Sequence, residues 1–338
     1  MLILGIESSC DDTAAAVLEN TQLKSNVLSS QDAIHNTFGG VVPELASRQH
    51  LQAICPIVQL ALEKAGVALE EIDLIAATQG PGLIGSLLVG FSYAKALAYT
   101  LKVPLVGVDH MAGHILSIFL EKNQPQFPYI ALIVSGGTTS LFLAKNYQDH
   151  KLLGRTRDDA AGEAFDKVAK LLGLPYPGGP HVSLSASEGD AKYIQFPRAW
   201  LADNSLDFSF SGLKTAVLNH CNQQKQKKSV LQINNICASF QEAVVDVLVE
   251  KTVNAASEYN TKTIVIGGGV SSNTRLRQTF ERRCTEKNLL FYAPEPVFCT
   301  DNAAMIALAG YHAFMISGAS SLDIDVYSRP QYRLAGTE

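Results

Sequence analysis

The chain has 338 residues, of which 47% are hydrophobic and 17% charged, a composition typical of a folded protein without a long disordered region. Its formal net charge of −5 argues against a protein that wraps nucleic acid unaided. Binding of nucleic acid would need a local basic patch or a basic partner protein. The six cysteines form no Cys-x-x-Cys pair, which disfavours a zinc knuckle or a disulfide framework and favours reduced thiols. The apolar stretch 83–101 carries Lys95, so we expect no membrane span and a soluble, cytoplasmic protein.

The first part of the chain alternates apolar runs with polar turns. Residues 31–66 are predicted to be helical after a turn at 38–40, because apolar residues recur at steps of three and four and form one stripe. A second helix is expected to follow the glycine turn at 79–86 and to end near Tyr99. The strands predicted in this part are residues 1–7, 14–18, 72–78 and 104–108.

The second part of the chain repeats this pattern after Pro125 and Pro128. Helices are predicted over 158–173 and 274–287, with a mostly helical region at 181–260 and a last helix that ends near Ser317. The strands predicted in this part are residues 129–134, 140–144, 263–266 and 289–292.

The two halves therefore share one order of elements: strand, polar or glycine turn, strand, then helices, then strands that lead into helices. This weak internal repeat predicts an α/β protein of two duplicated lobes that face each other across a nucleotide- and metal-binding cleft. We expect lobe I to comprise residues 1–108 and 303–338, with a helical insertion near 31–66. Lobe II is expected to comprise residues 109–302, with helical insertions near 155–260.

The segment 105–115 predicts a short strand followed by a helix that opens with His110. Residues i and i+4 lie on one face of a helix, so His110 and His114 can direct two imidazoles to one point, which is a metal-ligand spacing. Asp301 is the best candidate for a third ligand, because it also precedes an alanine-rich helix. The alternative is a pair of solvated side chains on a surface helix. A zinc peptidase is disfavoured, because Met111 stands where the His-Glu-x-x-His motif needs a glutamate.

Two glycine turns are candidates for binding a nucleotide. Residues 135–139 and 267–269 follow strands and expose consecutive backbone N–H groups to which an anion can come close. Each alone is more often a tight turn, and neither has the spacing of a P-loop or of a dinucleotide-binding motif. Two such turns in a repeated lobe favour a nucleotide-binding site in the cleft. In such a site Asn273 would hydrogen-bond the ribose or base, and Asp166 would accept hydrogen bonds from the sugar hydroxyls.

Eight segments resemble the TsaD family of tRNA N6-adenosine threonylcarbamoyltransferases, formerly named O-sialoglycoprotein endopeptidase or Gcp. They cover nearly the whole chain in order, which makes the resemblance far more specific than any single motif. The segments are residues 5–13 (GIESSCDDT), 38–44 (FGGVVPE), 110–114 (HMAGH), 135–137 (SGG), 162–167 (GEAFDK), 176–180 (YPGGP), 267–270 (GGGV) and 300–305 (TDNAAM).

The resemblance implies the actin/Hsp70/hexokinase-like fold, which is ribonuclease H-like, in two duplicated lobes. It implies that His110, His114 and Asp301 bind one divalent metal ion, with iron favoured over zinc. The positions that match the family's substrate- or nucleotide-binding residues are Val134, Ser135, Gly136, Gly137, Thr138, Asp166, Gly179 and Asn273.

The implied reaction transfers a threonylcarbamoyl group from threonylcarbamoyl-adenylate to N6 of adenosine 37, in tRNAs that read codons beginning with adenine. The implied partners are tRNA, an inactive paralogue (TsaB), a small ATPase (TsaE) and the adenylate-forming enzyme (TsaC), with no membrane. An ATPase or regulatory scaffold of the same fold is the alternative.

Three residues depart from the usual family pattern. Asp12 stands in place of Glu, Thr138 in place of His or Asn, and Ser183 in place of Asp, so we assign no role to the Thr138 side chain. An adenylate is already activated and needs no covalent nucleophile. We therefore expect Asp11 or Asp12 to act as the catalytic base that accepts a proton from the amine, the alternative being carboxylates that cap a turn.

The isolated chain is expected to bind tRNA weakly, because its basic clusters are small. These clusters are residues 225–228 and the arginines of the helix 274–287. The apolar stripe between Leu51 and Ala65 is expected to pack against another chain, which the resemblance implies is the paralogue.

Overall fold

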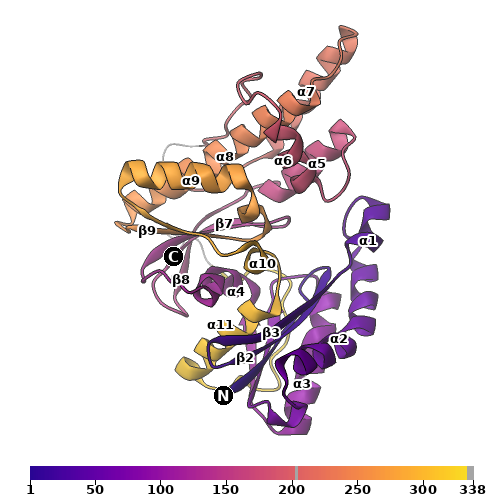
Figure 1. The fold of residues 1–338 in the computed structure, drawn as a ribbon, viewed down its shortest axis with the longest axis vertical. Helices are drawn as coiled ribbons and strands as arrows, with labels where there is room; N and C mark the ends of the chain where they lie inside the picture. The colour runs from indigo at the N-terminus through magenta and orange to yellow at the C-terminus, as the bar shows by residue number, and fades with distance from the viewer. Residues whose placement is uncertain (202–204, 333–338) are drawn as a thin grey trace. The chain divides into compact units, whose positions relative to one another are not determined.

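The computed structural model describes residues 1–201 and 205–332, which divide into two compact units. Unit 1 contains Met1–Gln124, Lys145–His150 and Val297–Tyr332, and unit 2 contains Pro125–Ala144 and the described part of Lys151–Pro296. Each unit is built on its own five-stranded sheet (Figure 1).

The sheet of unit 1 has the order β3-β2-β1-β4-β5. Its first three strands are antiparallel, whereas β4 is parallel to β1 and β5 is parallel to β4. The strands are β1 (Leu2–Glu7), β2 (Asp12–Glu19), β3 (Gln22–Ser30), β4 (Leu74–Gly80) and β5 (Leu105–Asp109). The helices assigned to this unit are α1 (Asp32–His35), α2 (Pro43–Ala65), α3 (Ile84–Leu101), α4 (His110–Leu116) and α11 (Ala303–Ser317).

Small residues let α11 lie directly on the sheet of unit 1, on the side opposite α2 and α3 (Figure 1). A Cβ atom at Gly5 of β1 would overlap the carbonyl oxygen of Ala303 and the side chain of Ala307. Similarly, a Cβ at Gly310 would overlap the side chain of Ala76 on β4. The alanine-rich helix therefore belongs to unit 1, and it brings Asp301, just before its first turn, into this unit.

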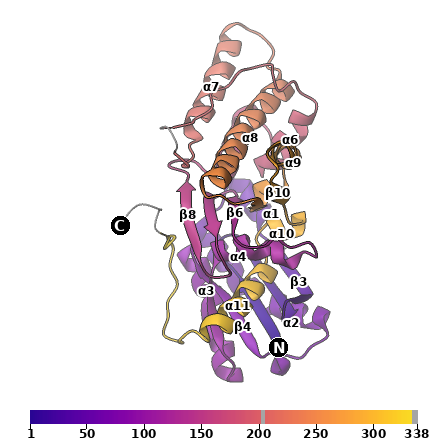
Figure 2. The ribbon, with the colours of Figure 1, turned by 90° about the vertical axis from the view of Figure 1, so that its left-hand side faces the viewer.

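The sheet of unit 2 has the order β10-β9-β6-β7-β8, and the long buried helix α8 packs on β6 and β9 (Figure 2). The strands are β6 (Tyr129–Val134), β7 (Thr139–Ala144), β8 (His150–Arg155), β9 (Thr263–Gly267) and β10 (Leu290–Tyr292). The helices are α5 (Ala161–Leu172), α6 (Gly178–Ser187), α7 (Ser211–Gln226), α8 (Ile233–Glu258) and α9 (Thr274–Lys287), and α10 (Pro296–Cys299) follows at the boundary. Short 3-10 helices are η1 (Asn36–Phe38), η2 (Leu69–Glu71), η3 (Ser117–Leu120) and η4 (Gly269–Ser272).

The two sheets have the same topology, which confirms the predicted duplication. Numbered in chain order within each unit, the strands of both sheets run third, second, first, fourth, fifth. In both, the first strand pairs antiparallel with the second and parallel with the fourth.

Some elements differ from the sequence prediction. The strands β3 and β8 were not predicted, because β3 is an edge strand with many exposed polar residues and no clear alternation. The turn predicted at 38–40 is present, since Gly39 has a positive φ of 70° and ends η1, and the long helix α2 begins after it at Pro43. The region 181–260 is mostly helical, as predicted, because it contains the end of α6 together with α7 and α8, although its part 188–201 contains no helix.

The bounds of the units also differ from the predicted lobes. Residues 109–124 and 297–302 lie in unit 1 instead of the second lobe, because β5 continues directly into α4 and α4 packs on α11. Among the described residues, α3 is the one helix with the length and apolar composition to cross a membrane, a test that core helices also pass. Its Leu87, Phe91 and Ala94 are buried within unit 1.

Candidate active site

The helix α4 carries both histidines of the candidate metal centre. Its first turn is capped by Asp109, whose Oδ1 accepts a hydrogen bond of 3.1 Å from the backbone N–H of Ala112. The imidazole rings of His110 and His114 lie on one side of the helix, with ring centroids 4.7 Å apart and planes nearly perpendicular. His114 is 2% exposed. The predicted i, i+4 geometry is therefore present.

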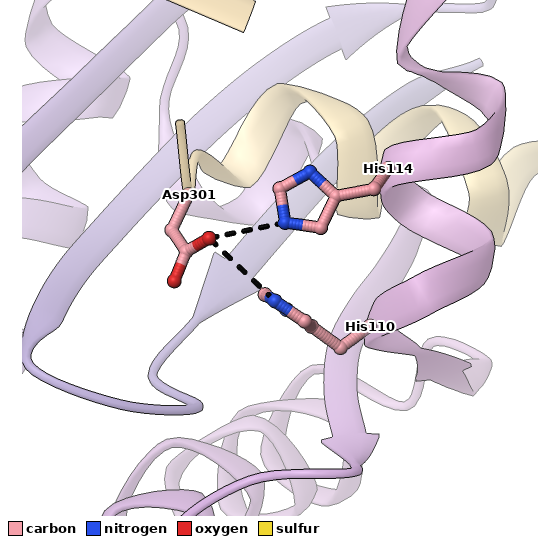
Figure 3. A group of neighbouring side chains, drawn as sticks. All are labelled: His110, His114 and Asp301. Carbon is pink, nitrogen blue, oxygen red and sulfur yellow. Dashed lines mark hydrogen bonds and ion pairs between the residues drawn. The ribbon is translucent and has the colours of Figure 1, made fainter. Parts of the chain in front are cut away.

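Asp301 completes a group of three potential ligands within unit 1 (Figure 3). Its Oδ1 lies 3.1 Å from Nε2 of His114 and 3.5 Å from Nε2 of His110. Asn302 caps α11 by accepting a hydrogen bond from the N–H of Met305, which fixes the backbone beside Asp301. Bonds of about 2.1 Å to one ion place neighbouring ligand atoms about 3.0–3.4 Å apart. The nitrogen–oxygen distance at His114 lies in this range and that at His110 is slightly longer, and all three donor atoms lie within 4.8 Å of one another.

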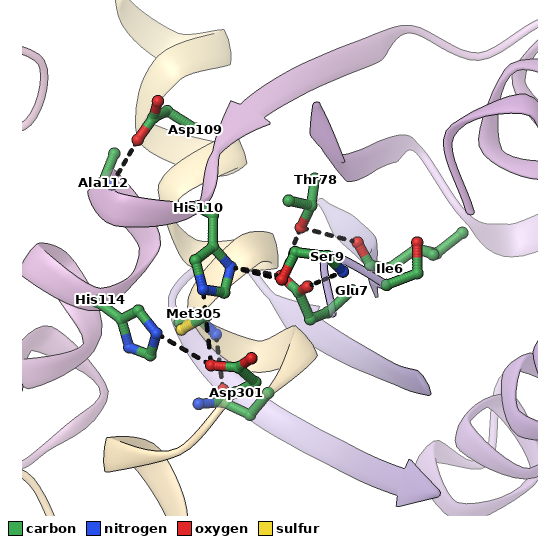
Figure 4. Close-up of polar contacts among 12 residues, drawn as sticks. Ile6, Glu7, Ser9, Thr78, Asp109, His110, Ala112, His114, Asp301 and Met305 are labelled. Atoms are coloured by element: carbon green, nitrogen blue, oxygen red, sulfur yellow. Dashed lines mark hydrogen bonds and ion pairs between the residues drawn. The ribbon is translucent and has the colours of Figure 1, made fainter. Parts of the chain in front are cut away.

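Glu7, at the end of β1, contacts Nδ1 of His110, the ring nitrogen that does not face Asp301 (Figure 4). Its Oε2 lies 3.0 Å from Nδ1 of His110 and accepts a 2.6 Å hydrogen bond from Thr78, while Oε1 accepts from the N–H of Ser9. A carboxylate can only accept, so in the neutral ring of His110 it keeps the proton on Nδ1 and leaves Nε2 as a lone-pair donor. Sequence reasoning missed Glu7, although a charged residue ending an otherwise apolar strand was a usable signal.

The electrostatics at His110 are set by the carboxylates of Glu7 and Asp301, which lie on either side of its imidazole. Burial lowers the pKa of His110, but the charges of Glu7 and Asp301 outweigh it and raise the pKa to about 9. Burial raises the pKa of Asp301, and the two histidines outweigh that effect and lower it to about 2. A positive charge is therefore required here, and either a proton on His110 or a cation on Nε2 supplies it.

The two carboxylates expected to include the catalytic base are Asp11, in the turn between β1 and β2, and Asp12, the first residue of β2. His50 of α2 holds this turn, because Nδ1 lies 2.8 Å from the hydroxyl of Thr13 and Nε2 lies 3.0 Å from the carbonyl oxygen of Cys10. Burial, followed by the charges of Asp301 and Asp11, raises the pKa of Asp12 to about 7. Its buried Oδ1 has no hydrogen-bond partner among the described residues. A carboxylate in this state suits proton acceptance near neutral pH.

In unit 2, Ser135 to Thr138 form the turn between β6, which ends at Val134, and β7. The N–H of Ser135 donates to the carbonyl oxygen of Thr138, and the Ser135 hydroxyl accepts from the N–H of Thr138. A Cβ atom added at Gly136 or Gly137 would have no neighbour within 4 Å. Packing within this unit therefore does not require these glycines, which leave the backbone of the turn open to approach.

The other predicted nucleotide-binding residues of unit 2 lie on α5, on α6 and directly before α9, and of these elements α5 contacts the turn. Gly162 of α5 donates its N–H to the carbonyl oxygen of Ser135. On the same helix, Asp166 accepts a 2.7 Å hydrogen bond from the N–H of Gly178 at the start of α6, beside Gly179. Asn273 caps α9 and donates to Gln241 at 2.7 Å. Asp166 and Asn273 thus each have a structural hydrogen bond in addition to any role toward a ligand.

The arginine-rich helix α9, expected to be a basic cluster, is largely neutralised. Arg275 forms an ion pair with Glu242, Arg283 pairs with Glu250 and Glu286, and Arg282 also pairs with Glu286. The sequence could not show the pairs with Glu242 and Glu250, because these two residues come from α8. No ion pair in the described part of the chain involves the lysines at 225, 227 and 228 near the end of α7.

Comparisons with known proteins identify the family and the fold of the chain. A family model described as "TsaD: tRNA N6-adenosine threonylcarbamoyltransferase" matches residues 22–308. A tRNA N6-adenosine threonylcarbamoyltransferase of Desulfotalea psychrophila is 62% identical over 335 residues, covering 98% of this chain and 97% of that protein. The protein of that name from Syntrophus aciditrophicus is 51% identical, covering 100% and 99%. Full-length HypF in its phosphate- and nucleotide-bound form has a similar fold, with a TM-score of 0.63 at 14% identity, covering 94% of this chain and 56% of that one.

Proposed function

The chain belongs to the TsaD family of tRNA N6-adenosine threonylcarbamoyltransferases and forms threonylcarbamoyladenosine in tRNA, and we propose that it does so with a divalent metal ion bound by His110, His114 and Asp301. The observation that carries this proposal is the convergence of three donor atoms within 4.8 Å, with Glu7 keeping the proton of the neutral His110 ring on Nδ1, so that Nε2 can bind the ion. Two neutral imidazoles and one carboxylate are a ligand set typical of divalent iron, which we favour over zinc. When bound, the ion supplies Lewis acidity that polarises the carbamoyl carbonyl.

We propose threonylcarbamoyl-adenylate as the donor and N6 of adenosine 37 as the acceptor, in tRNAs that read codons beginning with adenine. The amine attacks the carbamoyl carbon, the new C–N bond forms, and the bond from that carbon to the phosphate oxygen breaks to release AMP. The amine proton passes to a base. Asp12 is the better candidate for this base than Asp11, because its Oδ1 is unpartnered and its pKa is close to neutral.

The turns of unit 2 are the proposed site for the AMP portion of the donor. The backbone N–H groups of Gly136 and Gly137 are suited to the phosphate, because the absence of side chains leaves space for it. The end of β6 at Val134 and the glycine at 179 are suited to the nucleoside, with Asp166 accepting from its sugar hydroxyls and Asn273 bonding the ribose or base. The side chain of Thr138 has no proposed role.

The proposed partners are the paralogue TsaB, the ATPase TsaE and the adenylate-forming enzyme TsaC, all in the cytoplasm. TsaB is proposed to pack on α2, where Leu51 is 66% exposed and Leu60 is 38% exposed although both are apolar. Because α9 is neutralised, we expect the lysines at the end of α7 to contribute more to tRNA binding than the arginines of α9.

A reconstituted reaction tests the function. The chain is incubated with tRNA, threonine, bicarbonate, ATP and the three partner proteins, and tRNA nucleosides are measured by mass spectrometry alongside AMP. We expect threonylcarbamoyladenosine that depends on this chain. ATP hydrolysis that depends on this chain, without any modified nucleoside, would instead support an ATPase or scaffold of the same fold.

A further inference from the structure

Both carboxylate oxygens of Asp109, the residue directly before His110, are held by the C-terminal part of the chain. The hydroxyl of Tyr327 donates to Oδ2 at 2.6 Å, and the hydroxyl of Tyr332 donates to Oδ1 at 2.7 Å. Oδ1 also accepts the capping hydrogen bond from Ala112. Two residues more than 200 positions away thus fix the cap of the helix that carries both histidines.

The segment that brings in these tyrosines, residues 318–332, is called here the C-terminal strap. It contains no helix or strand and follows α11 as an extended trace (Figure 2). Ser320 donates its N–H to the carbonyl oxygen of Leu105, and its hydroxyl accepts from the N–H of Gly107. The N–H of Tyr327 donates to the carbonyl oxygen of Gln79, whose side chain donates to the carbonyl oxygen of Asp325. The strap therefore lies against β4 and β5 within unit 1.

Two glycines on these strands make space for the strap. A Cβ at Gly80 would overlap the carbonyl oxygen and ring of Tyr327, and a Cβ at Gly107 would contact Ile324 of the strap and the side chain of Gln79. This complementarity is independent of the hydrogen bonds to Asp109. It indicates that the position of the strap is specified by the sequence of the sheet, and not only by the tyrosines themselves.

The geometry of α4 explains why this clamp matters. The helix has seven residues, too few to be stable without tertiary contacts, and the first of them is His110. A small rotation at Asp109 would move Nε2 of His110 away from Asp301. Burial and the charge of Asp109 raise the pKa of both tyrosines, so their hydroxyls stay protonated and able to donate.

We propose that Tyr327 and Tyr332 are positioning residues for the metal centre, acting through Asp109 to hold α4 in the orientation that converges its two histidines on Asp301. The part of this inference that concerns metal affinity rests on the proposed function. The part that concerns the order of α4 does not, because it follows from the hydrogen bonds to Asp109 alone.

The test uses the full chain with Tyr327→Phe and Tyr332→Phe combined, which removes two hydroxyls and keeps both rings. Affinity for Co²⁺ is measured by equilibrium dialysis of the metal-free protein, and amide hydrogen exchange is followed in peptides covering α4. We expect Co²⁺ binding at least about tenfold weaker and faster exchange in α4, the size of effect seen when outer-shell partners of metal ligands are removed.

Two controls separate positioning from general stability. Tyr99→Phe removes the hydroxyl of an exposed tyrosine, and Ser320→Ala loosens the strap at Gly107 while both hydrogen bonds from the tyrosines to Asp109 remain. Both are expected to keep wild-type Co²⁺ affinity, even if Ser320→Ala lowers the melting temperature. If the double variant does not fold, Tyr327→Phe alone is used.

Unchanged exchange in α4 of the tyrosine variant would overturn the proposal. So would an equal loss of Co²⁺ affinity in Ser320→Ala, because the strap would then act only through stability. If the wild-type chain bound no Co²⁺, the metal assignment would fail while the exchange measurement still decided the role of the clamp.

Discussion

Replacing Glu7 with glutamine tests how the metal centre is prepared. Glutamine keeps the size of the side chain but turns one acceptor oxygen into an NH₂ donor. The backbone N–H of Ser9 can only donate, so the remaining oxygen must stay opposite it, at the position of Oε1. The NH₂ group then faces Nδ1 of His110 and the hydroxyl of Thr78.

The consequence for His110 follows from its two ring nitrogens. With an NH₂ donor opposite, Nδ1 must become an acceptor, and the ring proton moves to Nε2, the nitrogen that faces Asp301. A protonated Nε2 cannot bind a metal ion. We therefore expect Glu7→Gln to weaken metal binding about 10- to 100-fold, or about 1.4–2.8 kcal/mol, the range for loss of an outer-shell carboxylate.

The assay is Co²⁺ or Fe²⁺ affinity of the metal-free protein, with modified nucleoside formation as a second readout. Thr78→Val is the matched control, since it removes the other partner of Oε2 and leaves the contact between Glu7 and His110. It should keep metal affinity within about threefold of wild type. Wild-type affinity in Glu7→Gln would refute the argument that Glu7 sets the protonation of His110.

Three further predictions concern other residues. Asp12→Glu should retain most activity, whereas Asp12→Ala should slow transfer at least about tenfold in the nucleoside assay if Asp12 accepts the proton; a full-rate alanine variant would reduce Asp12 to a turn residue. Gly137→Ala should weaken AMP binding, measured by calorimetry, without lowering the melting temperature, because the added Cβ meets no neighbour. Gly162→Ala should instead lower the free energy of unfolding by about 1–3 kcal/mol, because its Cβ overlaps Ser135. Unchanged AMP binding together with a lower melting temperature in Gly137→Ala would contradict the proposed nucleotide site. Burial raises the pKa of Asp158, but hydrogen bonds from residues 209–211 outweigh this effect and lower the pKa. The difference in the free energy of unfolding between wild type and Asp158→Asn, measured in urea, should therefore be present at pH 7 and disappear as the pH falls through the folded-state pKa of Asp158. A difference that does not depend on pH would show that the charge of Asp158 contributes nothing to stability.

Local patterns were sufficient to predict the parts of the site that depend on one element. The spacing of His110 and His114 follows from helix periodicity, and the start of an alanine-rich helix singled out Asp301. The repeat of strands and turns predicted two sheets of equal topology, which the structure has. These features need only the chain's own periodicity.

Contacts between distant residues were beyond such reasoning. The bond from Glu7 to His110 spans 103 positions, and that from Tyr332 to Asp109 spans 223. No local pattern encodes these pairs, because they arise from the order of strands in the sheet and the path of the strap. The neutralisation of Arg275 was missed for the same reason, since its partner Glu242 lies on another helix.

The most direct test of the account is the reconstituted reaction with Asp301→Asn, an isosteric change at the residue that joins both histidines. Metal content by mass spectrometry and threonylcarbamoyladenosine per tRNA are measured on the same preparation, with the melting temperature as a check of folding. We predict that a folded variant loses both the metal and the modified nucleoside. A folded variant with wild-type metal content and a wild-type rate of nucleoside formation would contradict it.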